Sequence, residues 1–267
     1  MTNSPRGVVE PGAGWRELVD EFDRWAEWGW EATLWWRDDD AVAPSPCLER
    51  LLAAAGEVPV ALAAIPGLAE QALERAAAAH RGVFFLQHGW KHVNHAPAGG
   101  KKSEFPPERS LAAAKTDLAR GWERLAALFG ARALPVLVPP WNRLAAPLVP
   151  LLPGCGFAGL SRAQARSAAR PAPGLRESNI HVDLVAWASG RGFVGEAAAL
   201  GGLVRHLRAR REDRLDRAEP TGILTHHLVT DLACESFLRR LAAVSLAHRG
   251  ARWLAGPEVF SAAPVPA

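Results

Sequence analysis

The sequence lacks any uninterrupted apolar run of about 18 residues, the length that a membrane-spanning helix needs. Residues 1–14 also lack the charged and then apolar pattern of a signal peptide. We therefore expect a protein without a membrane span and with a cytoplasmic location.

Cysteine is scarce. Cys47, Cys155 and Cys234 are far apart, and no two of them form a Cys-x-x-Cys pair. This distribution fits a reducing compartment and argues against a metal site built from thiolates.

Excess charge of either sign is also small, with 31 basic against 28 acidic residues. The resulting net charge of +3 says little about binding partners. The longest basic cluster, residues 205–217, is interrupted by Glu212, Asp213 and Asp216, which is typical of a solvated helix face. We expect no nucleic-acid partner, and the sequence does not indicate an oligomeric state.

Tyrosine is absent, whereas tryptophan occurs 11 times, and lysine occurs only at positions 91, 101, 102 and 115. Three of these four lysines flank a histidine-rich segment. They either form a cationic loop that meets an anionic substrate group or belong to a solvated loop. Residues 96–107, which carry two of the lysines, have no periodicity, and loops of about a dozen residues are often functional lids.

Short apolar runs that alternate with helical patterns make up most of the chain. We predict strands at residues 32–36, 58–63, 82–86, 134–138, 156–160, 178–185, 221–227 and 251–254. We predict helices at residues 15–28, 48–55, 67–80, 108–129, 145–152, 195–217 and 231–248. This alternation predicts an α/β fold with a parallel sheet and right-handed crossovers. No linker divides the chain, so residues 1–267 form one predicted domain, with residues 1–30 as a helical extension outside the sheet.

Three histidines, His88, His92 and His95, follow the predicted strand 82–86 within a few residues. In parallel α/β folds the C-terminal ends of the strands are where ligands bind. Neutral imidazole is a common ligand for zinc-like ions. Read alone, the segment is either a metal site or a set of histidines that cap a strand and form hydrogen bonds in a loop.

Polar groups stand at the ends of four other predicted strands as well. They are the run 37–40 (Arg-Asp-Asp-Asp), the turn 139–141 (Pro-Pro-Trp), the pair Asp183 and Trp187, and the pair His226 and His227. Three adjacent carboxylates repel one another unless a cation or solvent relieves them. A barrel-like parallel sheet would bring all of these strand ends to one face, which predicts a shared metal-centred site.

The same series resembles the motifs of the polysaccharide deacetylase family, carbohydrate esterase family 4, over roughly residues 33–260. Residues 37–41 resemble its Thr-Phe-Asp-Asp-Gly motif, and residues 88–92 match the spacing of its His-Ser/Thr-x-x-His motif. Residues 138–141 are similar to Arg-x-Pro-aromatic, residues 183–187 loosely to Asp-x-x-Asp-Trp, and residues 224–226 match Leu-x-His. The resemblance implies a distorted (β/α) barrel with about seven parallel strands.

The resemblance also implies a set of roles. Asp40, His88 and His92 would bind a divalent metal, with Zn²⁺ first and Co²⁺, Ni²⁺ or Mn²⁺ as alternatives. Asp39 would be the general base, and His226 would protonate the departing amine. The implied substrate-binding residues are Trp90, His95, Pro140, Trp141, Arg143, Asp183, Trp187 and Leu224. Among these, Trp90 and Trp141 would offer faces for a sugar ring, and Trp187 and Leu224 would enclose an acetyl methyl group.

Two departures from the family pattern leave questions open. Val138 replaces the motif arginine, so the partner that orients Asp39 must be another residue, with Arg37 and Arg143 as candidates. Ala186 replaces the second aspartate of the fourth motif, and Asp183 is the candidate for tuning His226. The register of the acidic run is ambiguous by one residue, since Asp38 and Asp39 could also be base and ligand. His95 and His227 could be ligands, substrate contacts or core histidines.

The function that this reading implies is a metal-dependent deacetylase that acts on an N-acetylated sugar or a related small amide. One alternative is a non-catalytic metal-binding or carbohydrate-binding member of the fold. Another is a metal-dependent hydrolase of a different amide or of an ester. An expected cytoplasmic location favours a small or precursor substrate over an extracellular polymer.

Overall fold

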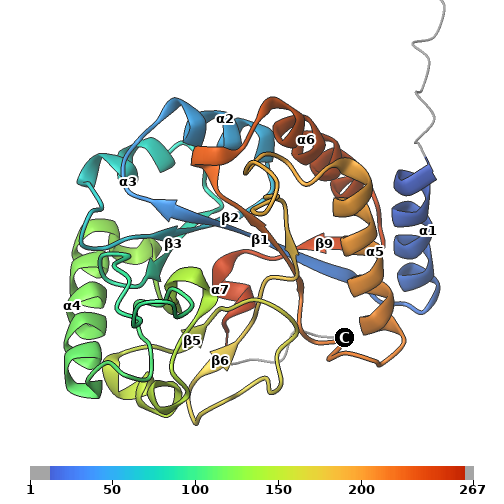
Figure 1. Ribbon diagram of the computed structural model, residues 1–267. Coiled ribbons are helices and arrows are strands. Elements are labelled where there is room, and N and C mark those ends of the chain that lie inside the picture. Colours follow the sequence, from blue (N-terminus) through green and yellow to red (C-terminus); the bar gives the residue numbers. More distant parts are fainter. Residues whose placement is uncertain (1–12, 262–267) are drawn as a thin grey trace, which may run out of the picture.

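A computed structural model describes residues 13–261 and shows one parallel sheet that curls into a half-barrel (Figure 1). The strand order is β6-β5-β4-β3-β2-β1-β8-β7, and β9 pairs with β1. The strands are β1 (Ala32–Ala41), β2 (Val60–Ala64), β3 (Val83–His88), β4 (Ala133–Val138), β5 (Gly159–Leu160), β6 (Arg176–Glu177), β7 (Val182–Asp183), β8 (Thr221–Thr225) and β9 (Ala251–Trp253). The prediction of a parallel α/β barrel-like sheet is confirmed.

Helices cover the convex side of the sheet in Figure 1. They are α1 (Ala13–Glu27), α2 (Pro46–Ala55), α3 (Gln71–Ala77), α4 (Leu111–Phe129), α5 (Glu196–Arg211) and α6 (Leu232–Leu246). The short α7 (Gly256–Val259) lies instead inside the curve of the sheet, where Val259 packs with Trp35 and Leu224. The 3-10 helices are η1 (Gly130–Arg132), η2 (Pro140–Asn142), η3 (Ala146–Leu151), η4 (Pro153–Cys155) and η5 (His227–Val229). None of the helices formed by residues 13–261 has the length and apolar character that a membrane crossing requires.

Several predicted boundaries differ from the structure. The helix predicted at residues 145–152 is the 3-10 helix η3, where Pro150 in the interior lacks the amide hydrogen that an α-helix needs. The strand predicted at residues 178–185 shrinks to β7, and the helix predicted at residues 195–217 ends at Arg211. Strand β6 and helix α7 were not predicted, because elements of two to four residues carry almost no periodicity.

Helix α1 packs against α5, outside the sheet as predicted, but it is not peripheral to the core. Trp15, Leu18, Phe22 and Trp25 are each 2% exposed or less and belong to the same apolar cluster as the sheet and helix residues. The part of the predicted extension before residue 13 lies outside the described residues.

Alternation along the strands divides the interior into two layers. Trp36 and Ile223 point into the cluster between the sheet and the helices. Trp35 and Leu224, their neighbours in sequence, point into a second cluster inside the curve of the sheet. Because neighbouring strand residues face opposite sides, each polar residue at a strand end belongs to one layer or the other.

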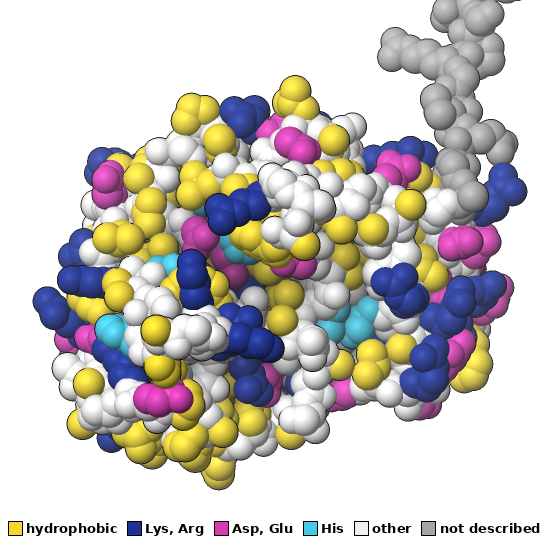
Figure 2. Space-filling model, in the orientation of Figure 1, with side chains coloured by type: hydrophobic (Ala, Val, Ile, Leu, Met, Phe, Trp, Pro, Cys, Tyr) yellow, Lys and Arg dark blue, Asp and Glu magenta, His cyan; other side chains and the backbone are white. Residues whose placement is uncertain are grey.

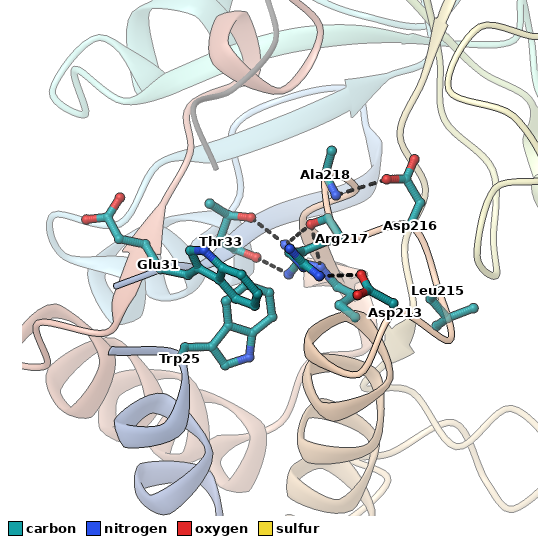
Figure 3. Close-up of a pocket in the computed structure, with 10 residues that line it drawn as sticks. Trp25, Glu31, Thr33, Asp213, Leu215, Asp216, Arg217 and Ala218 are labelled. Carbon is teal, nitrogen blue, oxygen red and sulfur yellow. Dashed lines mark hydrogen bonds and ion pairs between the residues drawn. The ribbon is translucent and has the colours of Figure 1, made fainter. Parts of the chain in front are cut away.

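A cavity of about 400 Å³ lies at the start of β1, at the opposite end of that strand from its aspartates (Figure 3). Its walls include Trp25, Trp30 and Arg217, and the Arg217 guanidinium lies 3.8 Å from the centre of the Trp30 ring. Arg210 crosses from α5 to β1 and donates a hydrogen bond of 2.8 Å to the carbonyl oxygen of Thr33. Buried Arg210 therefore links α5 to β1 at this end of the sheet.

Candidate metal centre

Asp40, His88 and His92 converge beside the C-terminal ends of β1 and β3, and one ligand atom from each lies within 4.8 Å of the others. Asp40 Oδ1 is 3.2 Å from His88 Nε2 and 3.5 Å from His92 Nε2. In Figure 2, acidic and histidine side chains meet near the centre of this face, next to basic and hydrophobic ones. The three side chains offer one carboxylate oxygen and two imidazole nitrogens to a common point.

His88 is the last residue of β3, and its ring is hydrogen-bonded on the side away from Asp40. Its Nδ1 lies 3.0 Å from the carbonyl oxygen of Val138 on the adjacent strand β4. A carbonyl oxygen can only accept, so Nδ1 carries a hydrogen; Nε2, which faces Asp40, carries a second hydrogen when the ring is charged and offers a lone pair when it is neutral. Val138, which replaces the family arginine in sequence, therefore contributes its backbone to the orientation of a predicted ligand.

Two of the three side chains depend on an unusual backbone. Asp40 has φ of 70° and His92 has φ of 58°, both in the left-handed region that non-glycine residues rarely adopt. Asp40 has the same strand phase as Asp38, which faces the helix layer. The left-handed turn at Asp40 allows its carboxylate to reach His88 instead. Such strain is retained where the surroundings enforce it, commonly at functional sites.

The three side chains of the cluster shift one another's pKa values. Burial alone would raise the pKa of Asp40, but the hydrogen bond and charge of His88, with His92 and His226, bring that pKa well below its usual range. Burial opposes protonation of His88, yet the carboxylates of Asp39 and Asp40 raise its pKa overall. Burial and the nearby His88 lower the pKa of His92. An ionised carboxylate with two imidazoles is a donor set that fits a zinc-like divalent ion.

Segment 88–92 is held in place by a residue that sequence reasoning missed. Glu104, 1% exposed, accepts hydrogen bonds from the backbone N–H groups of Trp90 and Lys91 at 3.1 and 2.9 Å. Gly89 has φ of 63°, and a Cβ there would collide with Glu104 and Pro140. The loop at residues 96–107 thus has a definite role, because it supplies the carboxylate that shapes the histidine segment.

Asp39 is 2% exposed and forms an ion pair with Arg37 of the same strand. Arg37 Nε lies 2.8 Å from Asp39 Oδ1, and its Nη2 donates to Asp39 Oδ2 at 3.0 Å. Arg37 in turn donates to Ser161 Oγ at 2.7 Å and to Asn142 Oδ1 at 2.8 Å. Arg143, the other candidate, is exposed and donates to the carbonyl oxygen of Lys102 instead. The partner of Asp39 is therefore Arg37.

His226 follows β8, and its ring lies 4.8 Å from the Trp187 ring in an edge-on arrangement. The carboxylate of Asp183 accepts from Val185 N at 2.9 Å and from Trp187 Nε1 at 2.8 Å. Burial raises the pKa of Asp183, against the nearby charge of His226. Asp183 thus fixes Trp187, and no residue among 13–261 forms a hydrogen bond with His226 Nδ1.

The predicted substrate-binding residues differ in their exposure and in what they contact. Trp141, with φ of 56°, places its ring 4.3 Å from the His92 ring, and Pro140 is buried beside Gly89. Trp187 is 48% exposed, whereas Leu224 is 1% exposed and belongs to the inner core.

Two further candidates differ from expectation. Trp90 is 7% exposed, and Arg120 of α4 covers its ring at 4.8 Å, so it does not present the open face that the sequence suggested. His95 is exposed, and its backbone N–H donates to the carbonyl oxygen of Ser103 at 2.9 Å.

Comparison with other proteins gives similarity at the level of structure. No family model matches the sequence, and no curated protein matches it. The Bc1960 peptidoglycan N-acetylglucosamine deacetylase is 15% identical, with a TM-score of 0.56 over 88% of this chain and 90% of that one. A putative polysaccharide deacetylase from Mycobacterium smegmatis is 17% identical, with a TM-score of 0.55 over 85% and 87%. A family 4 acetyl xylan esterase from Clostridium thermocellum, in complex with a cobalt ion, is 13% identical, with a TM-score of 0.51 over 86% and 90%.

The half-barrel is thus the fold of a class of hydrolases that contains deacetylases and esterases. Within that class the chain has the polysaccharide deacetylase fold of the family 4 carbohydrate esterases, as its motifs predicted. At these identities the similarity establishes the fold, and the chemistry has to be argued from the chain's own residues.

Proposed function

We propose that the protein is a metal-dependent hydrolase that removes an acetyl group from an N-acetylated sugar or a related amide. The observation that carries this proposal is the convergence of Asp40, His88 and His92 beside a second carboxylate, Asp39, that is held by Arg37. Two carboxylates with different partners suit different tasks, one as a metal ligand and one as a base. The polysaccharide deacetylase fold supports the assignment.

In this proposal Asp40, His88 and His92 hold a divalent ion, with Zn²⁺ as the first candidate. Such an ion supplies Lewis-acid polarisation of the carbonyl oxygen and lowers the pKa of water from about 16 towards 7. The hydrogen bond from His88 Nδ1 to Val138 presents the Nε2 lone pair, and the left-handed turn at Asp40 presents the carboxylate.

Asp39 accepts the proton of the attacking water. Arg37 contacts both of its carboxylate oxygens and fixes its direction, so the base does not need to reorganise during the reaction. Because Arg37 performs the orienting role, the replacement of the family arginine by Val138 is no argument for a non-catalytic protein.

His226 donates a proton to the departing nitrogen, because an amide nitrogen is a poor leaving group as an anion. Exposed Trp187 lies against His226 and half-buried Trp141 lies against His92, so aromatic rings border the proposed site at two points. We propose these two rings as the surfaces that contact the sugar and its acetyl group. We propose the backbone N–H of Trp141 as a donor to the developing oxyanion, a contribution typically of about 3 to 4 kcal/mol.

The proposal is tested by amine release from short N-acetylated sugars, with the protein loaded in turn with Zn²⁺, Co²⁺, Ni²⁺ and Mn²⁺. Wild-type protein should release amine, and Asp39→Ala should reduce the rate by about 100-fold or more, the usual contribution of a general base. Equal rates for wild type and Asp39→Ala over a broad panel of amides and esters would favour a binding protein instead.

A further inference from the structure

A third aspartate of the acidic run, Asp38, has partners of its own. It is 0% exposed, and its Oδ2 accepts from Thr225 Oγ1 at 2.6 Å while its Oδ1 lies 2.5 Å from His227 Nδ1. Thr225 Oγ1 also accepts from Trp36 Nε1 at 2.7 Å. The side chains of Trp36, Asp38, Thr225 and His227 thus form a buried polar cluster that joins β1 to the end of β8.

This cluster lies on the opposite side of the sheet from the inner face of the proposed site. Trp36 belongs to the core between the sheet and the helices, and Asp38 follows it in the same strand phase. Thr225 has the same phase as Ile223, which also faces the helices. Asp38 is therefore placed behind the sheet, where it has no direct access to a substrate on the inner face.

His226, the proposed acid, stands in the sequence between Thr225 and His227, the two partners of Asp38. Its backbone is extended, with φ of −134° and ψ of 100°, so its side chain points away from those of Thr225 and His227 and lies against Trp187. Within residues 13–261 nothing forms a hydrogen bond with His226 Nδ1. The direction of its ring thus depends on the backbone, which Asp38 fixes on both sides.

Stability alone is a weak reason for such a cluster. A buried charged pair is often no more stabilising than apolar residues of similar volume, because its desolvation offsets its attraction. Here one carboxylate contacts both neighbours of a single functional histidine. This arrangement is suited to fixing a direction.

We propose that Asp38 and His227 are a positioning pair that holds His226 over the proposed metal centre from behind the sheet. This inference rests on the proposed function. In amide hydrolysis the C–N bond breaks as a C–O bond forms to the oxygen of water, and the departing nitrogen keeps the electron pair and takes a proton from His226. An aryl acetate releases a phenolate that needs no such proton, so loss of the position of His226 affects amides and not aryl esters.

The test compares N-acetylated sugar with 4-nitrophenyl acetate in Asp38→Asn and His227→Gln. For the amide, kcat should fall about 10- to 100-fold with KM changed less than about threefold, because general acids contribute about 100-fold or more. The rate on the aryl ester and the bound metal per chain should stay within about twofold of wild type. The matched control is His206→Gln, another buried histidine, which should leave the ratio of the two rates unchanged.

A parallel fall of amide and ester rates, or no fall in either, would overturn the positioning role. If the single variants fail to fold, the apolar pair Asp38→Leu with His227→Phe keeps the test open, because a well-packed apolar pair tends to be tolerated where one unpaired charge is not.

Crystal structures of the same variants provide a readout that does not depend on activity. The His226 ring should leave its contact with Trp187 in the variants and keep it in His206→Gln. An unmoved ring would refute the positioning pair. Inactivity of wild-type protein on both substrates would instead refute the proposed function and leave the structural readout valid.

Discussion

Arg37 and Asp39 lie two residues apart on β1 and form a buried ion pair, with Arg37 Nε 2.8 Å from Asp39 Oδ1. Residues two apart on a strand share a face, so a single strand supplies both the proposed base and the cation that orients it. The proposed ligand Asp40 departs from the regular alternation of side chains because its backbone is left-handed. The division of tasks within the acidic run follows from these two facts.

Replacing Arg37 should therefore damage both activity and stability. In Arg37→Met, Asp39 is left as a buried carboxylate without its cation, a change that typically costs about 3 to 5 kcal/mol. We expect a large loss in the free energy of unfolding by urea and a fall in kcat of about 100-fold for any variant that folds. Arg143→Met is the control, since Arg143 is exposed, and it should leave stability within about 0.5 kcal/mol. Equal effects of the two variants would contradict the assignment of Arg37.

Removing the imidazole ligands should abolish metal binding. His88→Ala combined with His92→Ala should reduce the metal per chain to background in elemental analysis, whereas His95→Ala should retain it, because His95 lies outside the cluster. Addition of the metal at about 100 times its Kd should stabilise wild type by about 2.7 kcal/mol and the double variant by nothing. Equal metal content in all three proteins would refute the site.

Gly89 offers a way to disturb the histidine segment without touching a ligand. Gly89→Ala adds a Cβ that collides with Glu104 and Pro140 at a φ of 63°, so it should displace residues 88–92 and weaken metal affinity by at least about tenfold. Gly99→Ala is a matched control, since Gly99 has a φ of 78° but open space around it. It should show only the backbone strain, of about 1 kcal/mol, with unchanged metal affinity. Affinity losses of the same size in both variants would mean that strain alone, and not the collision, is responsible.

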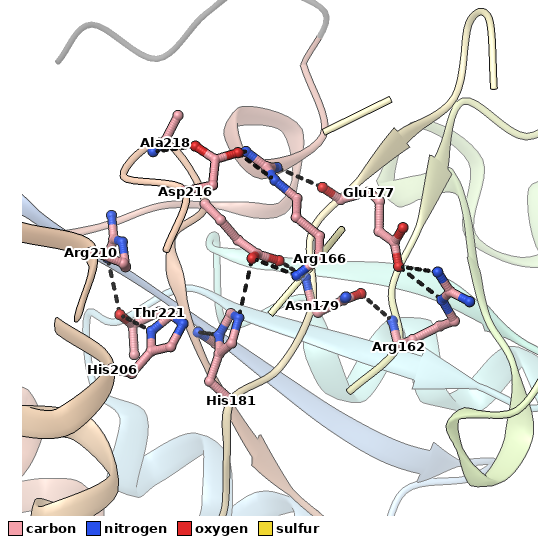
Figure 4. A network of polar contacts seen from close by, with 12 residues as sticks. Arg162, Arg166, Glu177, Asn179, His181, His206, Arg210, Asp216, Ala218 and Thr221 are labelled. Atoms are coloured by element: carbon pink, nitrogen blue, oxygen red, sulfur yellow. Dashed lines mark hydrogen bonds and ion pairs between the residues drawn. The ribbon is translucent and has the colours of Figure 1, made fainter. Parts of the chain in front are cut away.

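A buried histidine pair should make the fold sensitive to acid. His206 stacks on His181 with 3.6 Å between the ring centres, and both belong to the polar network of Figure 4 with Arg210 and Arg166. Glu219 Oε2 lies 3.5 Å from His181 Nε2. Burial, then the charges of His181 and Arg210, lower the pKa of His206 from 6.5 to about 2. The unfolded chain thus binds a proton below pH 6.5 that the native state refuses until about pH 2.

The contribution of His206 is fully present above pH 6.5 and is lost as the pH falls towards 2. The free energy of unfolding should decline by up to about 1.4 kcal/mol per pH unit in that window. His206→Gln should flatten this decline in urea titrations between pH 7 and 4, whatever its effect on stability at pH 7. An unchanged slope would show that His206 does not titrate differently in the two states.

The sequence by itself determined the strand alternation, the parallel sheet and the strand-end positions of the polar residues. Apolar periodicity fixes which segments are strands, and parallel strands bring their C-terminal ends to one edge, so a site shared by the acidic run and the histidine segment could be anticipated. The resemblance to the deacetylase motifs then singled out Asp40, His88 and His92 within it. The same alternation implies that Arg37 and Asp39, two residues apart on a strand, share a face.

Only the tertiary structure decided how these residues are held. Ser161 and Glu104 come from loops and Asn142 from the three-residue η2, segments without periodicity, and their contacts depend on where distant segments meet. The two-sided sheet also places Asp38 with His227 behind the site and leaves Asp39 inside it, although all three aspartates are adjacent in sequence. A linear pattern names the residue types, whereas side-chain direction follows from the local backbone and from packing against elements far along the chain.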